Sequence, residues 1–232
     1  MAPTHLPLFG GNRAWTQSDW TTSDDRVRGG ASTSTLTCSP SSLTALFHGT
    51  LDITALGGAG FASQRTTGED RTWDLSSYDG IELVLDARHA DDKLYTLTLK
   101  DEIRARRPDG REQSSVSWEF DFRATRTRIF VPWAAFRATY RGRDKGDAGE
   151  LDLGNVKRFG IMVRSFFGDQ EGPFELGIVS IAAKGNGRYL DCPEAEEEDG
   201  RGEDEFLDEK VAWGLDRVGW FAWLTSCFGR RS

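Results

Sequence analysis

The chain has 232 residues, 38% of them hydrophobic, and a formal net charge of −8. Residues 191–232 hold 12 acidic and 5 basic side chains, whereas residues 1–190 hold 25 acidic and 24 basic ones. The first 190 residues therefore lack the basic excess of proteins that bind nucleic acids, and no nucleic-acid partner is expected. No stretch of about 20 apolar residues is present to cross a membrane.

The three cysteines indicate free thiols. Cys38, Cys192 and Cys227 are far apart and form no C-x-x-C pair, and an odd number with such spacing is typical of a reducing compartment. The first ten residues have no apolar segment like that of a secretory signal, so we expect a protein that is not secreted.

Residues 1–20 carry Phe9, Trp15 and Trp20 and are expected to lie along the domain as a packed leader. From residue 43 onward, apolar and polar residues alternate in short segments, which is the pattern of β-strands. The predicted strands are 43–51, one that starts at 61 after the glycine-rich turn 57–60, 81–87, 94–100, 116–122, 128–133, 159–166 and 174–182.

Individual strands carry more specific expectations. Ile81, Leu83, Leu85 and Ala87 should share one face of their strand, because successive side chains alternate. Pro132 places segment 128–133 at a sheet edge or a bulge. The stripe on 116–122 should face the core; it consists of Val116, Trp118, Phe120 and Phe122.

The number and spacing of these strands predict the fold class. Roughly nine or ten short strands with turn residues between them, and no long helical stripe, favour an all-β jelly-roll sandwich over residues 21–187. Residues 188–205 are strongly acidic and should form a flexible linker.

Residues 206–228 show an amphipathic helical pattern. Their candidate contact residues are Trp213, Trp220, Phe221 and Trp223. Three interpretations stay open, since such a helix could dock on the domain, bind a groove of a partner, or lie on a membrane surface.

No motif indicates catalysis. His5, His48 and His89 are isolated in sequence, and no spacing is typical of a nucleophile with its base or of a metal site. We therefore expect no catalytic residue, no metal and no cofactor.

Two groups of residues are candidate partner contacts. The first is Asp25, Arg26 and Arg28 beside Gly29 and Gly30, with an organised Asx-type turn as the alternative. The second is the basic loop around Arg104, Arg106 and Arg107, which could contact an acidic partner or be a solvated hairpin tip.

Several segments, taken in order, resemble the complex I intermediate-associated protein 30 family. They are 25–32 (DRVRGGAS), 47–51 (FHGTL), 58–65 (GAGFASQR, with Ala59 as an insertion), 74–81 (DLSSYDGI) and 172–181 (GPFELGIVSI).

The resemblance implies a galactose-binding-like domain that acts as a non-enzymatic assembly factor or chaperone for mitochondrial complex I. It implies a protein partner, possible contact with a membrane surface through 206–228, and a mitochondrial location, although no clear presequence is present and the cytoplasm is the alternative. A carbohydrate-binding module is the rival hypothesis, with Trp118 or Trp133 as the aromatic platform. An enzyme acting on a nucleotide is a third hypothesis that no residue supports.

Overall fold

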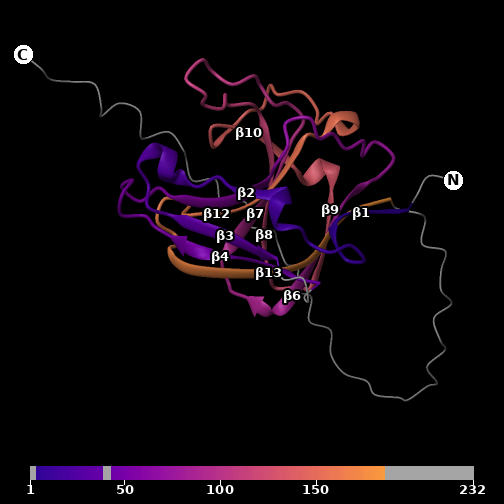
Figure 1. The fold of residues 1–232 in the computed structure, drawn as a ribbon, viewed down its shortest axis with the longest axis horizontal. Coiled ribbons are helices and arrows are strands. Elements are labelled where there is room, and N and C mark those ends of the chain that lie inside the picture. Colours follow the sequence, from indigo (N-terminus) through magenta and orange to yellow (C-terminus); the bar gives the residue numbers. More distant parts are fainter. Residues whose placement is uncertain (1–3, 39–42, 186–232) are drawn as a thin grey trace, which may run out of the picture. The chain divides into compact units, whose positions relative to one another are not determined.

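A computed structural model describes residues 4–38 and 43–185. The expected linker at 188–205 and the expected helix at 206–228, with Trp213, Trp220, Phe221 and Trp223, lie outside the described residues. Within the described residues, thirteen strands form two antiparallel sheets, and the helices are 3-10 turns of three or four residues (Figure 1). The expected all-β sandwich is thus confirmed.

The first sheet has six strands. Its order is β3 (Thr33–Cys38), β4 (Ala45–Leu51), β13 (Gly172–Lys184), β6 (Gly80–Ala90) and β9 (Arg128–Pro132), with β1 (His5–Gly10) also paired to β13. Of these, β3, β4 and β13 run side by side in Figure 1. Strand β1 pairs with β13, since Leu6 lies opposite Ala183, so the expected leader contributes a strand to the sheet. Among the described strands, β9 pairs with β6 alone on this sheet and ends at Pro132, as the edge position predicted for it requires.

The second sheet has seven strands. Its order is β11 (Arg143–Asp144), β10 (Arg137–Tyr140), β8 (Ser117–Arg123), β7 (Leu94–Lys100), β12 (Arg158–Arg164), β5 (Phe61–Thr66) and β2 (Trp20–Thr22). The 3-10 helices are η1 (Gln17–Asp19), η2 (Asp25–Arg28), η3 (Trp133–Ala135) and η4 (Leu153–Asn155).

The core fills the space between the two sheets. From β7 it receives Tyr95, Leu97 and Leu99, each 0% exposed. Trp118 and Phe122 of β8 are buried as predicted, and Val116 and Phe120 pack against the same core from partly exposed positions. Because side chains alternate along a strand, the residues between these apolar positions point to the opposite face of the second sheet.

Two expectations from the alternating pattern are wrong: Ala87 does not share the buried face of Ile81, Leu83 and Leu85, and the strand predicted at 43–51 starts at Ala45. Ala87 is exposed, because the register between β6 and β13 shifts: Leu176 lies opposite Ala90, whereas Gly177 lies opposite Asp86. Such a bulge breaks the alternation of side chains. Leu43 is 63% exposed, because its strand begins only at Ala45.

Candidate functional site

The outer face of the second sheet is lined by polar side chains, and we call it the polar face. Strands β5, β7, β8 and β12 supply its members, which are Ser63, Arg65, Thr96, Thr98, Lys100, Ser117, Glu119, Asp121, Arg158, Gly160, Met162 and Arg164. The register aligns Glu119, Thr98, Gly160 and Arg65 in one row across the four strands.

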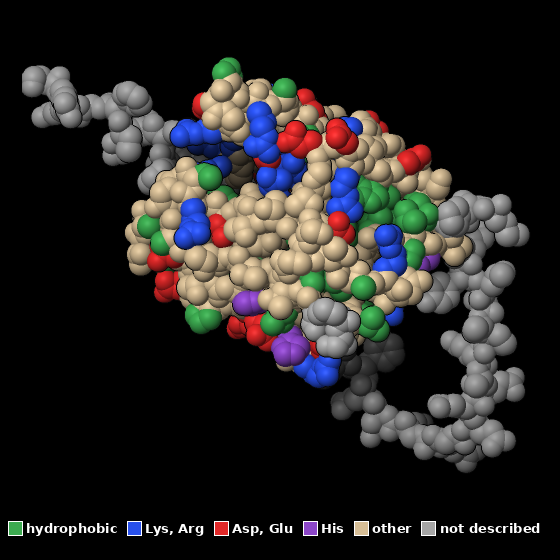
Figure 2. Space-filling view, viewed as in Figure 1, with side chains coloured by type: hydrophobic (Ala, Val, Ile, Leu, Met, Phe, Trp, Pro, Cys, Tyr) green, Lys and Arg blue, Asp and Glu red, His purple; other side chains and the backbone are tan. Residues whose placement is uncertain are grey.

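A hollow of about 130 Å³ opens on this face. Gly160 is one of the residues that line it, and a Cβ atom at this position would lie 2.5 Å from Thr98 Oγ1. Figure 2 shows Lys and Arg side chains gathered around a hollow in the upper half of the view, with acidic side chains beside them. The hollow is lined by Ser23, Ser63, Gln64, Arg65, Thr98, Lys100, Ser117, Glu119, Arg158, Gly160 and Met162.

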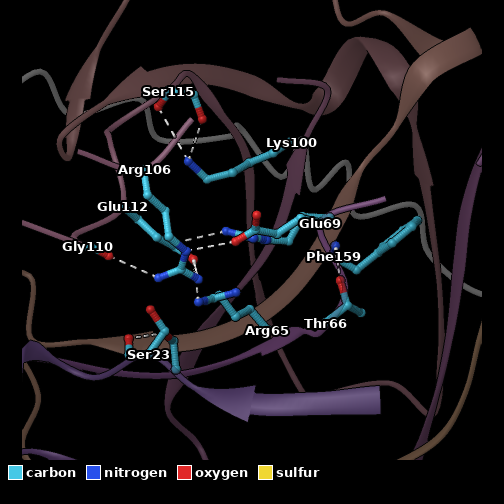
Figure 3. Close-up of polar contacts among 12 residues, drawn as sticks. Ser23, Arg65, Thr66, Glu69, Lys100, Arg106, Gly110, Glu112, Ser115 and Phe159 are labelled. Atoms are coloured by element: carbon cyan, nitrogen blue, oxygen red, sulfur yellow. Dashed lines mark hydrogen bonds and ion pairs between the residues drawn. The ribbon is translucent and has the colours of Figure 1, made fainter. Parts of the chain in front are cut away.

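Glu112 joins two basic residues at the edge of the hollow. It lies on the loop 101–116, and its carboxylate accepts a hydrogen bond from Arg65 Nη2 at 2.7 Å and one from Arg158 Nη1 at 3.1 Å. Arg106 of the same loop approaches Glu112 at 3.5 Å and pairs with Glu69 at 2.9 Å (Figure 3). The loop is therefore held to the polar face by ion pairs.

Lys100 and Arg158 are directly opposite each other on β7 and β12. Arg158 is 7% exposed. Lys100 Nζ donates to Ser115 Oγ at 3.0 Å (Figure 3), and burial together with the charge of Arg158 lowers the pKa of Lys100. Burial and the Arg158 charge also lower the pKa of Arg65. The Nε atoms of Arg65 and Arg158 are buried without a hydrogen-bond partner within the described part of the chain.

The other half of the polar face is balanced in charge. Arg164 contacts Glu119 at 2.8 Å and Asp121 at 2.7 Å, and Arg137 contacts Asp121 at 2.7 Å. Thr139 Oγ1 donates a further hydrogen bond to Glu119 at 2.8 Å. Each carboxylate here therefore has a cationic partner.

The predicted basic loop is only partly near this site. Arg106 reaches the edge of the polar face through Glu69 and Glu112, as described above. Arg104 pairs with Glu102 of its own loop at 3.1 Å, and Arg107 is exposed.

Asp25 requires a correction as a candidate partner contact. Its side chain is 0% exposed, and its carboxylate accepts hydrogen bonds from Ser32 N at 3.1 Å, Ser32 Oγ at 2.7 Å and Phe61 N at 3.0 Å. The carboxylate thus bonds seven residues along the chain and across to β5, rather than within a local Asx turn. Arg26 and Arg28 are exposed on η2, and Arg28 stacks over the Phe61 ring at 5.4 Å.

Asp24 forms a second clamp of the same kind. It accepts hydrogen bonds from Ser34 N at 2.9 Å, Ser34 Oγ at 2.6 Å and Ser63 N at 2.8 Å. Burial raises the pKa of Asp24, although these hydrogen bonds oppose the rise. The two carboxylates tie β3 to β5, so this motif organises the fold.

The tryptophans proposed as sugar platforms are already engaged. Trp118 is 7% exposed and donates through Nε1 to Asp101 at 3.1 Å. Trp133 is half-buried, donates to the Tyr78 carbonyl at 2.6 Å and packs on Phe136. Trp118 as a platform is therefore wrong, because it belongs to the core.

Sequence reasoning missed Arg65, Lys100, Glu112 and Arg158. A single outward charge on a half-exposed strand is ordinary, so none of them stands out alone. The available signal is their pairing, since like charges directly opposite each other on neighbouring strands are unfavourable. That signal needs the strand register, which the sequence alone does not supply.

Residues 4–38 and 43–185 contain neither a cluster of metal-ligating side chains nor a membrane-spanning helix. No group of three or more His, Cys, Asp or Glu side chains there is placed to hold a metal ion. None of the helices in that part is long and apolar enough to cross a membrane.

A second, open hollow of about 540 Å³ lies at β4 and β13, beside His48, Asp91 and Glu175.

The fold is shared with solved carbohydrate-binding modules. The Family 11 Carbohydrate-Binding Module from Clostridium thermocellum, solved with a β-1,3-1,4-mixed-linked tetrasaccharide, aligns over 78% of this chain and 95% of its own at a TM-score of 0.52 and 13% identity. The same family's module of the cellulase Lic26A-Cel5E from that organism aligns over 80% and 96%, with a TM-score of 0.52 and 14% identity. At this identity, the likeness establishes the fold.

Sequence comparison identifies closer relatives. A protein of Schizosaccharomyces pombe that carries the name "Uncharacterized protein C9E9.15" is 43% identical over 185 residues, which is 77% of this chain and 83% of its own. The family model described as Complex I intermediate-associated protein 30 matches residues 9–178, from β1 into β13. The chain therefore belongs to the complex I intermediate-associated protein 30 family.

Proposed function

We propose that this protein is a non-enzymatic assembly factor that binds a protein partner through its polar face during the assembly of mitochondrial respiratory complex I. The family match supports the biological context. The observation that carries the binding face is the hollow beneath the loop 101–116, where Arg65, Lys100 and Arg158 lie close together.

A charged face of this kind suits selective recognition of another protein. Complementary charges steer encounter and exclude wrong partners, whereas an isolated buried charge is costly. The polar face combines satisfied ion pairs, such as Arg164 with Glu119, with a cation, Lys100, that forms no ion pair among the described residues. A partner that presents acidic groups could form ion pairs with such a cation.

The function can be tested in cells that lack the gene. Assembled complex I is measured on native gels after rescue with the wild-type chain, with Arg65→Ala, or with Arg26→Ala. Arg26 is an exposed arginine on η2 that does not line the hollow, so its variant is the control. We expect rescue by the wild type and by Arg26→Ala, and reduced assembly with Arg65→Ala. Normal complex I in cells without the gene would contradict the proposal.

The mitochondrial location belongs to the same proposal. Fluorescence of a tagged full-length chain should coincide with a mitochondrial marker. A cytoplasmic signal would instead favour the alternative compartment and a role outside the organelle.

A carbohydrate-binding module is the second candidate, because the fold resembles such modules. Sugar rings normally stack on exposed aromatic platforms, whereas Trp118 is buried and no aromatic side chain is among the residues that line the hollow on the polar face. Affinity electrophoresis in β-1,3-1,4-glucan should leave the migration of the protein unchanged. Retardation in the glucan gel would favour the carbohydrate-binding function.

A further inference from the structure

We infer that the hollow bounded by Arg65, Lys100 and Arg158 is a binding site for a phosphate monoester. The inference rests on the proposed function in taking the polar face as the binding face. It is more specific, because it names the chemical group that the hollow receives, and it can be tested without any protein partner.

The charges around the hollow do not balance. The charged side chains that line it, together with the network of ion pairs that continues outward from them, include six cations and four carboxylates. The cations are Arg65, Lys100, Arg106, Arg137, Arg158 and Arg164, and the carboxylates are Glu69, Glu112, Glu119 and Asp121. Two positive charges remain, which matches the charge of about −1.5 to −2 on a phosphate monoester at neutral pH.

The excess charge is concentrated at one pair of residues. Lys100 and Arg158 lie directly opposite each other, and like charges in this arrangement repel. Lys100 has only the Ser115 hydroxyl and carbonyl oxygens as hydrogen-bond partners among the described residues. The lowered pKa of Lys100 is the expected consequence of burial beside Arg158. An anion between the two side chains would relieve this repulsion.

Glu112 already shows how an oxyanion is held here. Its two carboxylate oxygens accept separate hydrogen bonds from Arg65 and Arg158, at 2.7 and 3.1 Å. Donors remain that this carboxylate does not use: Lys100 Nζ, and the buried Nε atoms of Arg65 and Arg158. The hydroxyls of Ser63, Thr98 and Ser117 line the same hollow.

A phosphate suits this arrangement better than another carboxylate does. A carboxylate presents two oxygens in one plane, whereas a phosphate monoester presents three strong acceptors in different directions. Arg65 and Lys100 lie on β5 and β7, the two strands that flank β12, which carries Arg158, so the three cations are spread across neighbouring strands around the hollow. Glu119 also lines it, but its charge is met by Arg164 at 2.8 Å.

The experiment is calorimetric titration of the full-length protein with inorganic phosphate and, separately, with a phosphoserine peptide, at constant ionic strength. Chloride and the unphosphorylated peptide are the reference ligands. We expect saturable binding of both phosphate probes. Tighter binding of the peptide indicates a phosphate monoester carried on a protein, and equal binding indicates that the hollow recognises the phosphate group alone, as on a small-molecule ester; either result supports the site.

Three variants make the test specific to this hollow. Lys100→Met removes a charged donor and should weaken phosphate binding about tenfold, the value of one charge-assisted hydrogen bond. Lys93→Met, at the other end of the same sheet, is the matched control and should bind as the wild type does. Glu112→Gln removes a competing carboxylate from an exposed loop and should strengthen binding severalfold.

Each outcome is decisive. The inference is overturned if phosphate shows no saturable binding below about 10 mM, or if Lys100→Met and Glu112→Gln bind as the wild type does. The melting temperature shows whether Lys100→Met is folded. If it is not, the affinity of Glu112→Gln for phosphate decides the test. Failure of phosphate binding with normal rescue of complex I would separate this inference from the proposed function.

Discussion

Asp25 shows how one buried carboxylate fixes the course of three chain segments. It lies on η2, and its oxygens accept hydrogen bonds from the Ser32 amide, the Ser32 hydroxyl and the Phe61 amide. The donors lie at the start of β3 and of β5, so the side chain joins an edge strand of one sheet to an inner strand of the other. Buried donors left without an acceptor are costly, and the residue therefore serves the fold rather than a partner.

The first prediction concerns this carboxylate. Asp25→Ala should lower the free energy of unfolding by about 3 kcal/mol, because it leaves buried donors unsatisfied. Urea unfolding followed by tryptophan fluorescence measures the change. Arg26→Ala, the exposed neighbour, should stay within about 0.5 kcal/mol of the wild type; equal losses for both variants would contradict the role given to Asp25.

The second prediction concerns Gly30, which packs against the same carboxylate. A Cβ atom at Gly30 would lie 2.2 Å from Asp25 Cγ. Gly30→Ala should therefore cost about 2 kcal/mol in the wild-type chain. In the Asp25→Ala background the clash is absent, so the added cost should fall by about 1 kcal/mol or more in a double-mutant cycle. Strictly additive losses would show that the two residues do not meet.

At the scale of the element, β1 contributes a strand and an aromatic anchor. Phe9 is 5% exposed and lies at the centre of a cluster with Trp15, Trp20, Trp73 and Phe159, at ring separations of 4.9 to 6.0 Å. Because the cluster joins residues near the start of the chain to β12, β1 is part of the core rather than an appendage.

The third prediction tests that role of β1. Phe9→Ala should lower the free energy of unfolding by about 3–5 kcal/mol, the usual cost of removing a buried aromatic side chain. Leu43→Ala, which truncates a residue 63% exposed, should stay within about 0.5 kcal/mol. Denaturant unfolding of the two variants measures both changes in the free energy of unfolding. A small effect of Phe9→Ala would mean that β1 is not needed for the stability of the fold.

The strands were predictable where alternation runs without interruption. The segments 94–100 and 116–122 match β7 and β8 because each buries one side against a continuous core. The position of Ala87 was not predictable because the bulge in β6 depends on the pairing of this strand with β13. The partner residues on β13 lie 86 or more positions further along the chain. Local patterns carry no information about such a shift.

The polar face was not predictable for a related reason. Lys100 and Arg158 become neighbours only when β7 and β12 pair, and Glu112 reaches them only when the loop 101–116 folds over the sheet. The sequence predicts the basic loop as a candidate contact, yet only Arg106 of its three candidate residues pairs with carboxylates at the edge of the polar face. Tertiary pairing, which the sequence alone does not supply, decides which charged side chains meet.

At the scale of the whole molecule, carboxylates paired with basic side chains connect the stability of the fold to pH. Asp86 is the clearest case: hydrogen bonds from the Arg88 side chain and amide lower its pKa from 3.8 to about 2. Burial raises the pKa of Glu82, but its carboxylate pairs with Lys184 and Arg128, each at 2.7 Å. These contacts outweigh burial, so the pKa of Glu82 is also lowered. Asp24, whose pKa is raised by burial, acts in the opposite direction.

The fourth prediction follows from the sign of the Asp86 shift. A carboxyl whose pKa is lower in the folded state binds fewer protons there than in the unfolded chain, so its contribution is complete above pH 3.8 and is lost as the pH falls toward 2. Asp86→Asn removes this contribution, and its loss of stability between pH 5 and pH 2.5 should be smaller than that of the wild type. Urea unfolding at both pH values measures the difference, with Asp109→Asn on the exposed loop as the control that keeps the wild-type profile. Parallel profiles for Asp86→Asn and the wild type would show that the Asp86–Arg88 pair, although held at 2.7 Å, does not couple folding to protonation.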